Sequence, residues 1–183
     1  MDLVSWSAEE AERRLASLGT RWAHTEGVVG RAQVLAPSVP AADRAVLIAA
    51  AYLHDIGYAS DVSDTGFHPL DGARWLHRQG RERLACLVAH HSGARFEADA
   101  RGLLGALEEF PEERSSTADA LTYCDLTTDP EGRQVTPSVR LAEIEGRHGT
   151  ESDVSRGMRA AAAALGAVVA RTEARIGRTP LVA

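Results

Sequence analysis

The chain of 183 residues has the length of one domain with a sizeable core, and its 44% hydrophobic and 25% charged residues are typical of a globular protein. Its formal charge of −6 disfavours binding to long nucleic acids or anionic membranes, because both require a basic face. The N-terminal segment lacks the features of a signal peptide and no stretch is apolar enough to span a membrane, so we expect a cytoplasmic protein.

Helical patterns account for nearly all of the chain. The first helix is expected at "SAEEAERRL", where Ser7 and Glu10 have the spacing of a capping box. Later helices are expected, in chain order, at 20–36, 41–54, 69–80, 81–91, 99–109, 115–127, 137–147 and 153–175. No strand pattern is convincing, although a two-residue hairpin within "DPEGRQVTP" stays open. We therefore predict a single all-α domain over residues 1–183.

The positive side chains and the cysteines narrow the chemistry further. The chain contains no lysine, so any anion that it binds must be held by arginine, by backbone N–H groups or by metal. Cys86 and Cys124 lie in predicted helices and have no C-x-x-C partner. We interpret both as buried thiols rather than as disulfide or zinc ligands.

Several titratable residues lie on helix faces that should point to the core. His54 continues the apolar stripe of the predicted helix 41–54, and Asp125 does the same in the helix 115–127. A buried carboxylate is costly unless a cation or several donors compensate it. His24 precedes Val28 by one turn and lies on a similar stripe. These positions favour a site inside the bundle.

Three further histidines lie at helix ends. His68 comes directly before Pro69, and His90 with His91 ends the helix 81–91 just before a glycine. His91 shares the apolar stripe of that helix, whereas His90 lies about 100° around it. A single core histidine is usually hydrogen-bonded to the backbone. The set as a whole instead predicts a metal site, because imidazole with carboxylate is the ligand set of Zn, Mn or Fe. His77 and His148 are interpreted as ordinary surface residues.

This ordered set resembles the HD-domain superfamily of metal-dependent phosphohydrolases, named for the pair seen here as His54-Asp55 in "LHDIG". The resemblance implies an all-α, HD-type helical bundle. Its metal-site core would cover about 20–128, with C-terminal helices at about 137–175 packing on it. It also implies that one metal is bound by the residues that match the family motif: His24 in "RWAHTEGVV", His54, Asp55, and Asp125 in "LTYCD".

Two more motifs, "HPLDGA" at 68–73 and "VAHHSG" at 88–93, resemble the dinuclear branch of that superfamily. This branch includes cyclic-dinucleotide phosphodiesterases, symmetrical diadenosine-tetraphosphate hydrolases and mixed-valent di-iron oxygenases. The resemblance implies a second metal that takes His68 and one of His90 and His91, with Asp55 as the bridge. The expected cofactors are therefore two divalent metal ions, Fe, Mn or Zn, with Mg as a further option.

Two departures from the family pattern bear on the substrate. Tyr58 stands where many phosphate-cleaving members have lysine, and "HHSGARF" lacks the Gly-Tyr-Pro signature of the cyclic-di-GMP enzymes, which argues against a cyclic dinucleotide. Arg21, Arg74 or Arg95 could supply the missing charge, although all three could equally be solvated. We take Asp55, Arg21 and Arg74 as the candidate catalytic residues.

The pattern therefore predicts a metal-dependent phosphohydrolase that acts on a small phosphate ester or nucleotide through metal-activated water. Its expected partner is a small molecule rather than a long nucleic acid or a membrane. Two alternatives stay open: a mixed-valent di-iron oxygenase, and a non-catalytic, metal-holding signalling domain. The sequence does not determine the metal, the substrate or the oligomeric state.

Overall fold

The computed structural model describes residues 1–178, and its regular structure is helical. The α-helices are α1 Leu3–Leu15, α2 Thr20–Leu35, α3 Arg44–Leu53, α4 His68–Arg78, α5 Glu82–His90, α6 Ala94–Ala100, α7 Leu104–Leu107, α8 Ser116–Leu126, α9 Pro137–His148 and α10 Asp153–Ile176. Short 3₁₀ turns connect several of them, and no strand occurs within 1–178. The all-α prediction is therefore confirmed. None of the described helices is long and apolar enough to cross a membrane.

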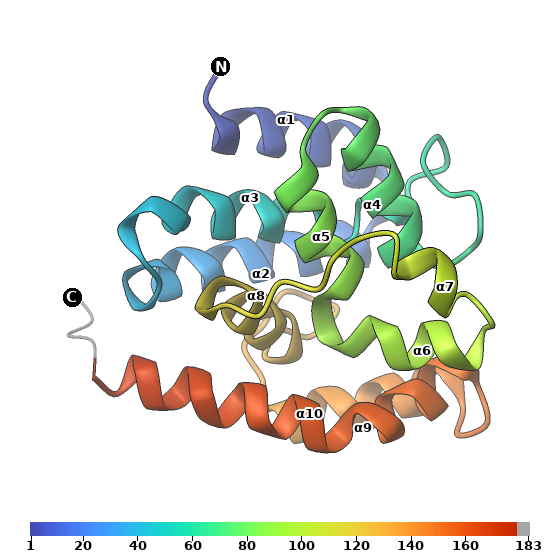
Figure 1. Ribbon diagram of the computed structural model, residues 1–183. Coiled ribbons are helices and arrows are strands. Elements are labelled where there is room, and N and C mark those ends of the chain that lie inside the picture. Colours follow the sequence, from blue (N-terminus) through green and yellow to red (C-terminus); the bar gives the residue numbers. More distant parts are fainter. Residues whose placement is uncertain (179–183) are drawn as a thin grey trace.

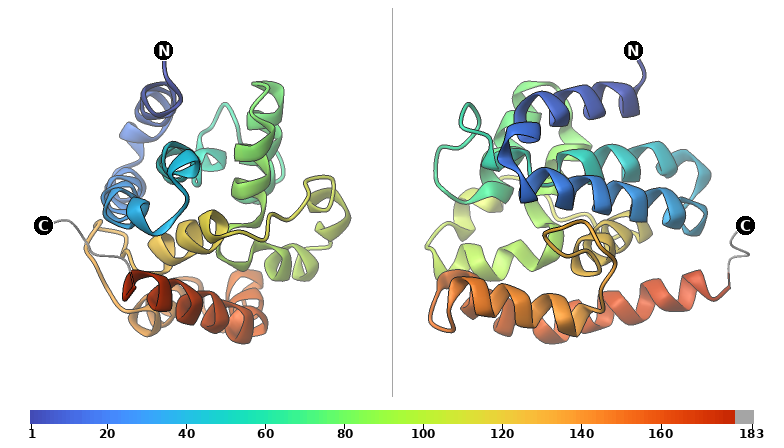
Figure 2. Two further views of the ribbon diagram at one scale, coloured as in Figure 1. Left: turned by 60° about the vertical axis from the view of Figure 1, so that its left-hand side comes forward. Right: turned by 180° about the vertical axis from the view of Figure 1, so that it is seen from behind.

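The helices are arranged around α8. In Figure 1, α1, α2 and α3 form the upper part of the molecule and α9 and α10 run along its lower edge. Between them, α8 contacts α2 and α3 on one side and α9 and α10 on the other, as the left view of Figure 2 also shows. Almost every side chain of α8 is buried. A carboxylate at the end of this helix, such as Asp125, is consequently inside the molecule.

The hydrophobic core lies between α3, α4, α5 and α8. Leu47, Leu53, Ile56, Leu70 and Leu121 have no exposed surface. Burying each of these side chains stabilises the fold by about 1.5–3 kcal/mol. The core therefore fixes the ends of α3 and α8 and the start of α4, which are the places where the titratable residues occur.

The first helix does not begin as the sequence suggested. It starts at Leu3, and the carboxylate of Asp2 caps it by accepting the N–H of Ser5 at 3.0 Å. Ser7 is buried within the helix and donates its hydroxyl to the Leu3 carbonyl. The predicted capping box at Ser7 and Glu10 is wrong, because an aspartate five residues earlier already satisfies the free N–H groups.

The predicted helix 99–109 is also wrong. The chain instead forms α6, which starts at Ala94, and the short α7, with Gly102 at φ +71° between them. A residue in the left-handed region interrupts a helix, and glycine adopts it without strain. The other predicted helices are present with small shifts at their ends. One example is the start of α4 at His68 rather than at Pro69.

Two further expectations concern the possible hairpin in "DPEGRQVTP" and the state of the two cysteines. Thr128 and Gln134 form an isolated antiparallel bridge, so the chain does turn back on itself there. Both cysteines are free, as expected. Cys124 is buried, and burial raises the pKa of its thiol to about 12. Cys86 is only partly buried, because it borders a surface cavity.

Candidate metal centre

Residues from four separate segments converge on one buried point. The donor atoms of His24, His54 and Asp55 lie within 4.8 Å of one another, and so do those of Asp55, His68 and His91. These side chains come from α2, from the end of α3, from the start of α4 and from the turn after α5. Asp55 belongs to both groups, which gives the cluster two halves that share one carboxylate.

Close backbone contacts hold these segments together. A Cβ atom on Gly57 would lie 2.1 Å from the carbonyl oxygen of His68, so only glycine lets the turn after Asp55 pack against the start of α4. A Cβ atom on Gly27 would lie 2.5 Å from the carbonyl oxygen of Gly132. The second contact lays the loop after α8 on α2, next to His24. Both glycines therefore serve the geometry of the cluster.

Three of the histidines share one arrangement, in which ring atom Nδ1 is hydrogen-bonded to a backbone carbonyl. The pairs are His24 with Asp129 at 3.1 Å, His54 with Ala51 at 2.8 Å, and His91 with Val88 at 2.7 Å. A carbonyl can only accept, so each Nδ1 carries the hydrogen and each neutral ring keeps a lone pair on Nε2. The protein thus fixes the tautomer that a metal ligand requires.

In the half of the cluster that contains His24, His54 and Asp55, atoms with free electron pairs lie close to one another. Nε2 of His24 lies 3.0 Å from Oδ1 of Asp125, and Nε2 of His54 lies 3.5 Å from Oδ2 of Asp55. Two atoms bound at right angles to one metal at about 2.1 Å would be separated by about 3 Å. The His54 ring is completely buried, and its Nε2 has no hydrogen-bond partner among residues 1–178. Such an atom calls for a partner, and a metal ion fits it.

The second half has the same character. Nε2 of His68 lies 3.3 Å from Oδ1 of Asp55 and 3.4 Å from Nε2 of His91. Asp55 therefore turns one oxygen towards His54 and the other towards His68. Asp55 could therefore be a ligand in both halves, and the donor set of each half would fit a divalent ion.

The charges around the cluster suit cation binding. Burial by itself would raise the pKa of Asp55, but the surrounding positive charge, including Arg21 with its guanidinium 2.7 Å away, outweighs it and holds the pKa well below its usual range. Burial also dominates at His54 and His68, where it lowers the pKa of the imidazole. Ionised carboxylate and neutral imidazole are the forms that bind metal.

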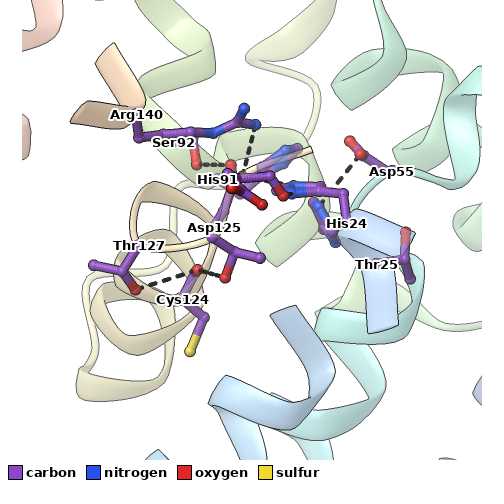
Figure 3. A network of polar contacts seen from close by, with 12 residues as sticks. His24, Thr25, Asp55, His91, Ser92, Cys124, Asp125, Thr127 and Arg140 are labelled. Atoms are coloured by element: carbon purple, nitrogen blue, oxygen red, sulfur yellow. Dashed lines mark hydrogen bonds and ion pairs between the residues drawn. The ribbon is translucent and has the colours of Figure 1, made fainter. Parts of the chain in front are cut away.

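Asp125 has partners that sequence reasoning missed. Its Oδ2 accepts a short hydrogen bond from the hydroxyl of Ser92, and the guanidinium of Arg140 lies 3.7 Å from its Oδ1. Figure 3 shows Ser92 and Arg140 together at this carboxylate. Ser92 is the one residue other than glycine at positive φ within 1–178. Ser92 lies within the "HHSG" motif, so the sequence could have indicated it, whereas no motif around Arg140 pointed to this contact.

The structure separates the two adjacent histidines. His91 lies in the cluster, whereas Nε2 of His90 lies 2.6 Å from the carbonyl oxygen of Phe110. The helix α5 ends at His90 and the backbone of His91 is extended, with ψ 152°, so the two rings leave the chain in different directions. Of the two, His91 is therefore the candidate ligand.

The candidate arginines also fall in different places. Arg21 contacts Asp55 directly. Arg74 lies 3.7 Å from Asp64 in the loop before α4, and Arg95 borders a different cavity. Of the three, only Arg21 borders the cavity beside the cluster. It is therefore the one that can act on a molecule bound there.

A cavity of about 280 Å³ opens beside the cluster, bordered by Asp55, His68, His91 and Asp125. Tyr58 forms part of its wall. The ring of His68 stacks on Tyr58 with centroids 4.2 Å apart, and the guanidinium of Arg21 lies 3.9 Å from the same ring. Two planar groups cannot share one face at these distances, so Tyr58 lies between them. It supports two residues that both contact Asp55.

Comparison with protein-family models matched residues 21–142 to the HD domain. The matched segment covers more than half of the chain and contains all the candidate ligands. Neither a search of curated proteins nor a search of solved structures found a significant match. The match agrees with the family indicated by the His54-Asp55 pair.

Proposed function

Because the chain belongs to the HD-domain family, we propose that it is a metal-dependent phosphohydrolase that cleaves a small phosphate ester or nucleotide with water. The observation that carries this proposal is Asp55, a buried carboxylate shared by two groups of histidine donors. Divalent ions bound there would lower the pKa of a coordinated water and balance negative charge on phosphate oxygens. The rest of the chemistry falls to the side chains around the cavity.

The protein residues have distinct parts in this proposal. Asp55 holds both halves of the centre together, and Arg21 fixes one of its oxygens by a charge-assisted hydrogen bond. The guanidinium of Arg21 also borders the cavity, where it can bind an anionic oxygen of the substrate. Tyr58 keeps Arg21 and His68 in place. Arginine can therefore supply the positive charge that lysine provides in other members.

The size of the cavity and the net charge support a small-molecule substrate. A volume of about 280 Å³ suits a phosphate ester or a mononucleotide better than a polymer. The acidic surface implied by a charge of −6 disfavours long polyanions and anionic membranes. We accordingly propose a cytoplasmic enzyme for a small phosphorylated molecule.

The test combines metal analysis with a substrate panel. Protein purified anaerobically would be analysed for metal, loaded with Mn, Zn, Mg or Fe, and assayed for phosphate release from phosphomonoesters, mononucleotides and dinucleoside polyphosphates. We expect metal-dependent release that a chelator stops. An iron form that consumes oxygen with a phosphonate or polyol, while the panel stays intact, would replace the hydrolase by an oxygenase. Metal binding without either reaction would indicate a non-catalytic domain.

A further inference from the structure

The inner face of α9 borders the same cavity as the start of α4. Four of its residues border the cavity, and they follow helical spacing i, i+4, i+7 and i+8: Arg140, Ile144, Arg147 and His148. A helical face of this kind is continuous. This face of α9 therefore presents two arginines and a histidine around one apolar side chain.

The two arginines of this face share their acidic partners with other groups. Arg140 and Arg147 share a single carboxylate, because the two oxygens of Glu143 each contact one of them. The side chain of Arg140 is only 5% exposed, and its Nε has no hydrogen-bond partner among residues 1–178. Its other acidic neighbour, Asp125, belongs to the metal centre. A buried guanidinium with an unsatisfied N–H calls for a further acceptor.

His148 is also surrounded by arginines. Its position on the surface was expected, but it also borders the cavity. Burial, together with Arg147, Arg21 and Arg101, lowers the pKa of its imidazole. Arg101 itself is paired with Glu97 at 2.7 Å. An anion bound near Arg147 and His148 would therefore meet a basic environment.

The geometry sets the length of the molecule that could use this face. Arg140 lies beside the metal centre, and Arg147 follows seven residues later, which corresponds to about 10 Å along a helix. Ile144 lies between them on the same helix, and the cavity is also bordered by the apolar Ala94 and Met158 and by the paired Glu97 and Arg101. A phosphate at the metal centre and an anion at Arg147 would thus be joined by a short, largely apolar segment.

We propose that the inner face of α9 recognises the substrate, and that it selects a phosphate ester carrying a second anionic group within about 10 Å of the phosphate that is cleaved. This inference rests on the proposed function, since it assigns the substrate class of the same site. Arg147 binds the second anion, with His148 beside it. Arg140 lies between that anion and the phosphate.

The test uses ω-phosphooxy carboxylates of three to six carbons, each paired with its primary amide. The two members of a pair have the same shape and differ only in the second charge. We expect the metal-loaded protein to prefer a carboxylate to its amide by about tenfold in kcat/KM, and to show the same preference in thermal-shift titrations. In Arg147→Gln the preference should fall towards one.

A matched control comes from α10. Arg159 is a similarly exposed arginine that pairs with Glu145 of α9 but does not border the cavity. Arg159→Gln should keep the wild-type preference. The inference would be overturned if the wild-type protein showed no preference for the carboxylate, or if Arg147→Gln kept it. Phosphate release in either case would still support the proposed hydrolase function. Selective binding of the carboxylates without any turnover would instead refute the hydrolase and retain the recognition surface.

Discussion

Two buried aspartates, Asp55 and Asp119, show how partners decide the role of a carboxylate. Both are almost inaccessible, with 2% and 9% of their surface exposed. Asp119 is bound by two guanidiniums, with Arg171 at 2.9 and 2.7 Å and Arg175 at 2.6 Å. Asp55 has one guanidinium, and its other neighbours are histidine nitrogens. The first charge is balanced inside the protein, whereas the second is arranged for an additional cation.

The Asp119 group links two helices, whereas the Asp55 cluster is the candidate functional site. The Asp119 group ties α10 to α8, and it borders a cavity of about 610 Å³, larger than the one beside Asp55. Volume alone would therefore point to the wrong place for the chemistry. Histidines with fixed tautomers and an unsatisfied nitrogen at His54 instead place the candidate metal centre beside the smaller cavity. The contrast teaches that donor chemistry, more than burial or size, locates such a site.

The largest expected effect is loss of metal in Asp55→Asn. The amide keeps the shape of the side chain but removes the charge that both halves of the cluster share, so metal content should fall from about two ions per chain to nearly none. Phosphate release should disappear with it. Elemental analysis after gel filtration measures the metal, and circular dichroism checks the fold.

Asp119→Asn is the matched control for that change. It makes the same substitution at the other buried aspartate, and it should keep both metals. If Asp55→Asn retained full metal content, or if both variants lost metal alike, the distinction between the two regions would be lost.

A smaller effect, the loss of one metal, is expected from His68→Ala. This change removes a donor from one half of the cluster and leaves His24, His54 and Asp125 unchanged, so about one ion per chain should remain. His90→Ala should bind two, because His90 faces the Phe110 carbonyl. Counting the metal ions bound by the two variants shows which of these histidines is a ligand. One tightly bound metal in the wild type, unchanged in His68→Ala, would indicate a mononuclear centre.

The control variant Asp119→Asn should keep its metals but should be less stable than the wild type. Asp119→Asn removes the charge that binds Arg171 and Arg175, and we expect the free energy of unfolding to fall by about 1–3 kcal/mol. The partial exposure of Arg171 keeps the loss below that of a fully buried pair. Urea unfolding in the presence of a chelator measures it without the metal contribution.

The same difference should depend on pH. Burial raises the pKa of Asp119, but its hydrogen bonds to Arg171 and Arg175 outweigh this and lower it. A carboxyl with a lowered pKa stabilises the fold above its unfolded value, near 3.9, and this contribution disappears as the pH falls through the folded value. The stability gap between wild type and Asp119→Asn should therefore begin to close below about pH 4 and vanish only once the pH is below the lowered pKa of the folded protein. A gap that does not narrow as the pH falls below about 4 would have another cause.

The smallest expected effect concerns Tyr58, which supports the centre without contributing a ligand. Tyr58→Leu removes the ring between Arg21 and His68, and metal affinity should weaken by about two- to tenfold, the range expected for stacking and cation–π contacts. Tyr58→Phe keeps the ring and should match the wild type. Competition with a chromogenic chelator measures the affinities, and equal values for Leu and Phe would remove the supporting role.

The sequence by itself determined the helical class and the set of ligand candidates. Both depend on local features: apolar periodicity defines helices such as α3 and α8, and His54 and Asp125 lie on their buried stripes. Residue type then indicates metal, since several imidazoles together with carboxylates form the ligand set of Zn, Mn or Fe. The family match over residues 21–142 agrees with this local information.

The tertiary structure decided what depends on backbone direction and on distant neighbours. His90 and His91 differ in role because the chain leaves α5 between them, and the direction that it takes is set by packing rather than by either residue. Arg21 reaches Asp55 across 34 positions of sequence, and Arg140 reaches Asp125 from the following helix. Periodicity describes one helix at a time, so contacts between helices, and with them the charge around the candidate ligands, follow only from the way the helices pack.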